Sequence, residues 1–104
     1  MLMQGSIDST AAVAFTVPAG RRAKLSVGYF SNQTTDTDEV VTYWVVKSGD
    51  SRSASNRRAP IDVPLNDTVR VFGVEELDLD PGDGIHVQSV GDDIVSFDFS
   101  MLLL

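Results

Sequence analysis

Apolar and polar residues alternate along much of the chain, and no segment repeats its apolar residues with the period of a helix. The clearest alternation lies near the C-terminus, where Val95, Phe97, Phe99 and Met101 are separated by two serines and an aspartate. Successive side chains of a strand point to opposite faces of a sheet. This segment therefore predicts a half-buried strand whose inward face brings aromatic side chains into the core.

Short runs rich in β-branched and aromatic residues, bounded by turn residues, predict the other strands. Residues 40–46 are apolar on both faces and contain the only tryptophan, so we expect this strand in the middle of a sheet and Trp44 in the core. Proline at both ends of 60–64 restricts that strand to an edge. The predicted strands cover residues 11–17, 23–30, 40–46, 60–64, 67–74, 77–79, 85–90 and 94–104.

Eight short strands in a chain of 104 residues are typical of a single two-sheet sandwich. The cysteine and tryptophan spacing of immunoglobulin domains is missing, which favours a jelly-roll-like arrangement. We predict an all-β fold, a single eight-strand antiparallel sandwich over residues 11–104, preceded by an N-terminal arm at residues 1–10. An immunoglobulin-like sandwich is the alternative.

Composition excludes several classes of function. Cysteine is absent, so disulfides, thiol catalysis and cysteine-based zinc sites are excluded. No apolar run approaches the ~18 residues that a membrane span needs, and the first residues lack the features of a secretory signal. The net charge of −7 argues against a protein that holds nucleic-acid phosphates. We expect no cofactor, no nucleic-acid partner and no membrane partner.

Charge is divided unevenly along the chain. Residues 1–60 carry seven Lys or Arg against five acids, and residues 61–104 carry one Arg against ten acids. The two halves thus have net charges of +2 and −9. Mixed charges on a folded surface account for this division, and an electrically bipolar domain is the alternative.

Several acids gather around a Pro-Gly pair, at Asp78, Asp80 and Asp83. Pro81-Gly82 suits a type II turn, because proline fixes its φ angle and glycine tolerates a positive one. We expect Asp83 to hydrogen-bond the backbone of this turn. A weak calcium site that also recruits Asp92 and Asp93 is the alternative, although the spacing differs from that of a helix-loop-helix calcium loop.

Few residues are suited to catalysis. The single histidine, His86, alternates with Ile85 and Val87 and is expected to face solvent, with a pH-sensitive contact as the alternative. Tyr43 and Trp44 are expected to pack in the core rather than to form a sugar-binding platform. Nothing isolates a pair of carboxylates in apolar surroundings, so we do not expect an enzyme.

Three segments are expected to contact other proteins. The arm carries apolar anchors, and three leucines at the C-terminal end would expose an apolar surface if nothing covered them. Residues 48–58, the longest polar stretch and the one expected to be most mobile, hold arginines that suit a partner rich in carboxylates. The predicted interface residues are Leu2, Met3, Ile7, Arg52, Arg57, Arg58, Leu102, Leu103 and Leu104.

Three motifs carry a resemblance to a known group: FTVPAGRRA at 15–23, LDLDPGDGI at 77–85 and VSFDFSM at 95–101. In this arrangement the chain resembles small β-sandwich virion proteins of tailed bacteriophages. The resemblance implies a non-enzymatic capsid decoration (cement) protein on the outer surface of the capsid. Such proteins bind the major capsid (coat) protein, often as a trimer on a symmetry axis. A phage tail or fibre subunit, structural or glycan-binding, is the alternative.

Overall fold

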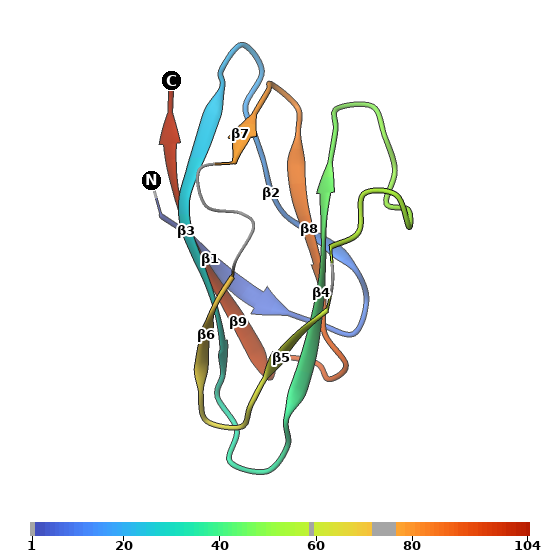
Figure 1. The fold of residues 1–104 in the computed structure, drawn as a ribbon, viewed down its shortest axis with the longest axis vertical. Coiled ribbons are helices and arrows are strands. Elements are labelled where there is room, and N and C mark those ends of the chain that lie inside the picture. Colours follow the sequence, from blue (N-terminus) through green and yellow to red (C-terminus); the bar gives the residue numbers. More distant parts are fainter. Residues whose placement is uncertain (1, 59, 72–76) are drawn as a thin grey trace.

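The computed structural model describes residues 2–58, 60–71 and 77–104. This part of the chain contains nine strands and no helix, and so no helix that could cross a membrane (Figure 1). The strands are β1 (Leu2–Ile7), β2 (Ala12–Thr16), β3 (Ala23–Asn32), β4 (Glu39–Val46), β5 (Ile61–Val63), β6 (Thr68–Arg70), β7 (Asp78–Leu79), β8 (Gly84–Gln88) and β9 (Val95–Leu103).

The strands form two antiparallel sheets. Sheet A has the order β1-β9-β3-β6, with β7 also paired to β3, and sheet B has the order β2-β8-β4-β5. With β7 set aside, β1 pairs with β9, β2 with β8, β3 with β6 and β4 with β5. These are the pairs of one long hairpin rolled into two layers, which is the arrangement of a jelly roll. The predicted all-β antiparallel sandwich of jelly-roll type is confirmed.

The core lies between the sheets and is built around aromatic rings. Phe99 is fully buried, and the centre of its ring lies 5.7 Å from that of Phe15, 5.9 Å from that of Phe30 and 5.5 Å from that of Phe97. Edge-to-face and tilted contacts of this kind add to the stabilisation from burying apolar area. The predicted inward face of the last strand is therefore confirmed.

Residues 2–7 differ from the prediction of a separate arm. They form β1, which pairs with β9 in unbroken register from Leu2 opposite Ser100 to Ile7 opposite Val95. The period-two pattern of this strand is hidden by Gly5, which lies on its inward side. A Cβ atom at Gly5 would come within 2.8 Å of the Phe97 ring, so an aromatic side chain of β9 occupies the space of the missing one.

The other strands lie close to their predicted positions. The structure shortens the segment expected between the two prolines at 60–64 to β5. Within 67–74 it forms β6, and residues 72–74 of that segment lie outside the described residues. Trp44 is buried as expected, at 9% exposed, but it lies on the outer face of sheet B rather than between the sheets, where its neighbour Tyr43 packs.

Candidate functional site: the two outer faces

One row of polar and aromatic side chains crosses the outer face of sheet A. Gln4 and Tyr29 both lie opposite Asp98, and Arg70 lies opposite Tyr29. Directly opposed residues point to the same face of a sheet, so these four form one line across β1, β9, β3 and β6. Gln4 Nε2 donates to Asp98 Oδ1 at 2.6 Å, and Tyr29 is 38% exposed. We call this line the sheet A row.

A polar hollow of about 250 Å³ opens beside the sheet A row. Ser31 and Thr68 lie opposite each other, one outward position beyond Tyr29 and Arg70, and their hydroxyls are 2.9 Å apart. Hydroxyl, amide and carboxylate groups line the hollow. The lining residues are Ser31, Asn32, Gln33, Asn66, Asp67 and Thr68.

Exposed leucines gather at the other end of the same face. Leu2 lies opposite Ser100, and Leu102 is two residues further along β9, so the two side chains are diagonal neighbours. Leu2 is 57% exposed and Leu102 is 59% exposed. Leu104, which is also exposed, is held to the start of β3 by its backbone N–H, which donates to the Arg22 carbonyl at 2.8 Å. We call Leu2, Leu102 and Leu104 the leucine corner.

The remaining apolar residues of the predicted interface face inward. Met3 and Leu103 are half-buried against the core. Ile7 is only 1% exposed and belongs to the core itself, because it is paired with Val95 on the inward side of sheet A. In this fold its side chain is not available to a partner. The expected anchors Leu2, Leu102 and Leu104 remain on the surface.

A second row crosses the outer face of sheet B. His86 lies opposite Val13 on one side and Trp44 on the other, and Arg57 lies opposite Trp44. Arg52 reaches over this row. Its guanidinium carbon is 6.0 Å from the centre of the Trp44 ring, and its Nη1 is 2.8 Å from His86 Nδ1. We call Val13, His86, Trp44 and Arg57 the sheet B row, with Arg52 as its cover.

The contact with Arg52 fixes the state of His86. A guanidinium only donates hydrogen bonds, so Nδ1 of His86 must accept and the ring proton lies on Nε2. Burial lowers the pKa of His86 below its usual value, and the positive charge of Arg52 lowers it further. His86 is half-buried rather than facing solvent as expected.

Hydrogen bonds join the polar segment 48–58 to β4. Val45 donates its N–H to the Asn56 carbonyl at 3.1 Å, and Arg58 donates its N–H to the Tyr43 carbonyl at 2.9 Å. Arg52 and Arg57 both lie beside Trp44 on the outer face of sheet B. Arg58, the next residue in the chain, lies near Tyr43, where its charge partly opposes the rise in the Tyr43 pKa that burial causes.

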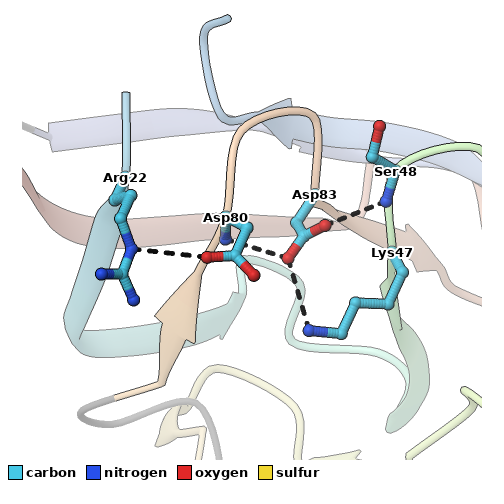
Figure 2. A network of polar contacts seen from close by, with 5 residues as sticks. All are labelled: Arg22, Lys47, Ser48, Asp80 and Asp83. Carbon is cyan, nitrogen blue, oxygen red and sulfur yellow. Dashed lines mark hydrogen bonds and ion pairs between the residues drawn. The ribbon is translucent and has the colours of Figure 1, made fainter. Parts of the chain in front are cut away.

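The acidic corner is a structural turn. Gly82 has a φ of 84°, and the Asp83 N–H donates to the Asp80 carbonyl at 3.1 Å, as expected for a type II turn. The Asp83 carboxylate, 2% exposed, accepts from the N–H of Ser48 at 2.9 Å and from the N–H of Asp80 at 3.0 Å. Lys47 Nζ lies 3.6 Å from it. Figure 2 shows these contacts converging on Asp83 from the turn and from the segment after β4.

The alternative of a calcium site receives no support from the described residues. Asp80 is paired with Arg22 at 3.4 Å. Asp92 follows the opposite end of β8 from Asp83 and accepts from the Ser9 backbone and hydroxyl, and these bonds lower its pKa. Within residues 2–58, 60–71 and 77–104, no three His, Asp or Glu side chains form a group that could hold a metal ion.

Sequence reasoning missed the neighbours in both rows. Gln4 meets Asp98 through the pairing of β1 with β9, and Arg52 meets Trp44 and His86 because the segment 48–58 folds back onto β4. Alternation indicated that Asp98 points outward, but no local signal identified its partner. Comparison with protein-family models, curated proteins and solved structures finds no match for this chain.

Proposed function

We propose that the chain is a non-enzymatic structural protein of a bacteriophage virion, a capsid decoration (cement) protein that binds coat subunits on the outer surface of the shell and stabilises them. The leucine corner is the observation that carries this proposal. Two large side chains, Leu2 and Leu102, are more than half exposed and adjacent on one face of a rigid sandwich. Apolar side chains that gather on a surface mark contacts with other proteins.

The hydrogen bonds made by the histidine and by the buried carboxylates support a role without catalysis. The one histidine is bonded to an arginine instead of a carboxylate, so it lacks the partner of a general base. The buried carboxylates of Asp83 and Glu39 accept hydrogen bonds from backbone N–H groups. Each of these groups therefore has a structural partner.

Attachment would combine apolar and ionic contacts. The leucine corner would fit an apolar patch of a coat subunit. Arg57 and Arg58 are exposed and, among the described residues, form no ion pair with a carboxylate, so they would pair with acidic side chains of a neighbour. Contacts of modest size add up when a self-associating protein, a trimer in the resembling group, engages several subunits at once.

Counting the protein in purified virions tests the proposal. Quantitative mass spectrometry of gradient-purified particles should give a copy number comparable with that of the coat protein. A Leu2→Asp/Leu102→Asp variant should be lost from particles, while Val40→Asp, which changes an exposed residue of sheet B, should be retained. A few copies per particle would favour the tail, and absence of the protein from virions would overturn the proposal.

A glycan-binding module of a tail or fibre is the second candidate, because the sheet A row leaves Tyr29 open. An exposed aromatic ring beside a carboxylate, an amide and a polar hollow suits a sugar, which stacks on the ring and hydrogen-bonds to its neighbours. A glycan array should then show binding that Tyr29→Ala abolishes and Val40→Ala preserves. Silence of the array, or equal binding by both variants, would exclude this candidate.

A further inference from the structure

The free edge of β1 differs from the other edges of the two sheets. An edge strand exposes unpaired N–H and C=O groups, and proteins usually protect such edges with charges, prolines, bulges or very short strands. β1 is six residues long and pairs one-to-one with β9 without a bulge. It contains no charged residue and no proline. It is therefore an edge to which another strand can be added.

The edges formed by β5, β6 and β2 are protected. β5 has three residues, lies between Pro60 and Pro64 and includes Asp62. β6 also has three residues and ends in Arg70. The register of β2 with β8 shifts between Val13 and Phe15, and a bulge of this kind twists an edge away from a flat partner.

We propose that β1 of one copy pairs antiparallel with β1 of a second copy about a two-fold axis, so that the two A sheets become one continuous sheet. This contact between copies is additional to the proposed attachment to the coat. A two-fold contact is isologous, since the same surface is used by both partners. It produces a dimer, or joins two larger assemblies, and differs from the three-fold arrangement of the resembling phage proteins.

The register follows from two constraints. Opposed residues must point to the same face, so the axis must pass through a residue rather than between two residues. The end of β1 near Ile7 is already occupied, because the Ile7 carbonyl accepts from Ser89 Oγ at 3.3 Å and the next carbonyl, that of Asp8, accepts from the Ser89 N–H at 2.9 Å. Among the positions that satisfy both constraints, an axis at Gln4 gives the longest pairing, from Leu2 to Ser6.

A second copy suits this edge because the symmetric contact contains no repulsion. Gln4 of one copy meets Gln4 of the other, Leu2 meets Ser6, and Met3 meets Gly5. None of these side chains is charged, although the whole chain has a net charge of −7. The contact is small, so the association is expected to depend on concentration.

Cross-linking by a single introduced cysteine tests the register, because the chain contains no cysteine of its own. Opposed residues of an antiparallel pair have Cα atoms about 4.5–5.5 Å apart, within the reach of a disulfide. Under mild oxidation Gln4→Cys should form a covalent dimer at least about tenfold faster than Val13→Cys, since pairing raises the local concentration of the thiols. Val13 is an exposed residue of the other N-terminal edge strand and serves as the matched control.

Sedimentation of the protein without coat subunits provides the second measurement. The natural chain should shift reversibly from monomer to dimer as its concentration rises to about 1 mM. Gln4→Lys should remain a monomer of unchanged melting temperature, because the lysine keeps a partner in Asp98 but meets a second lysine across the axis. Equal cross-linking at Gln4 and Val13, or a natural chain that stays monomeric throughout, would overturn the inference, whatever the virion measurements show.

Discussion

On sheet B the aromatic side chain of the outer row, Trp44, lies under Arg52, which also bonds His86 of the same row. On sheet A the corresponding aromatic residue, Tyr29, lies open beside Asp98. Each row crosses its sheet in a single line, but among residues 2–58, 60–71 and 77–104 a loop covers only the row on sheet B. The comparison teaches that one face is completed within the molecule, whereas the other presents its side chains to another molecule.

The largest effect on stability is expected from a comparison of substitutions on the two faces of β9. Phe99→Ala should lower the free energy of unfolding by about 3–5 kcal/mol, because the truncation leaves a cavity among the core rings. Leu102→Ala, on the open outer face of the same strand, should change it by less than about 0.5 kcal/mol. Chemical denaturation measures both. A large loss on Leu102→Ala would show that the leucine corner supports the fold of the single chain.

The next largest effect on stability is expected at Asp83, which holds the start of the segment 48–58. Asp83→Ala should cost about 1–3 kcal/mol, since it leaves the N–H groups of Ser48 and Asp80 without their acceptor. Asp80→Ala removes only a surface ion pair and should cost less than about 1 kcal/mol. Denaturation monitored by Trp44 fluorescence, which reports on the only tryptophan of the chain, measures both variants. Equal losses of stability in the two variants would show that Asp83 contributes no more to the fold than the surface ion pair of Asp80.

Removing the cover itself should have a smaller effect on stability and a clear optical effect. Arg52→Ala deletes the guanidinium over the Trp44 ring and should cost about 0.5–1 kcal/mol. Trp44 emission should shift to longer wavelength as water reaches the indole. Arg57→Ala, in the same row, serves as the control and should shift the emission less. An unchanged emission spectrum of Arg52→Ala would mean that the Arg52 side chain does not shield the Trp44 indole from water.

Acidification should break the contact between Arg52 and His86 and should cause the smallest change in stability of these tests. Burial and the Arg52 charge lower the pKa of His86 in the folded state, so below the usual histidine pKa of about 6.5 the unfolded chain binds the proton more readily. The contribution of the neutral ring is complete above that pH and is lost as the pH falls through the lower, folded-state pKa. Protonation turns Nδ1 into a donor that Arg52 cannot bond.

A pH titration of Trp44 fluorescence between pH 7 and 5 should therefore follow His86, the only histidine. The charged groups near it on this face are Arg52 and, beyond Trp44, Arg57. His86→Gln retains an acceptor for Arg52 and should abolish the fluorescence change. A titration that is the same in this variant would assign the change to other groups.

The sequence predicted features that depend on neighbours along the chain. Alternation from Val95 to Met101 predicted a strand and its buried face, and Pro81-Gly82 predicted the turn that the structure contains. Features that depend on contacts between distant segments were not predicted. Gly5 interrupts the apolar alternation of β1, so the strand was not predicted. The Phe97 ring fills the space that a side chain at Gly5 would take. Residues 40–46 are apolar on both faces, so the pattern did not reveal that Trp44 points outward beneath Arg52.

The placement of β9 between β1 and β3 has a consequence for biosynthesis. Sheet A has an empty position at its centre until the last of the nine strands leaves the ribosome, and β1 has no partner in the sheet before then. Pairing between segments so far apart slows folding, since a long chain loop must close before the contacts form. The domain should accordingly complete its fold only after β9 has been synthesised, and chains interrupted before β9 should be substrates for proteases rather than for assembly.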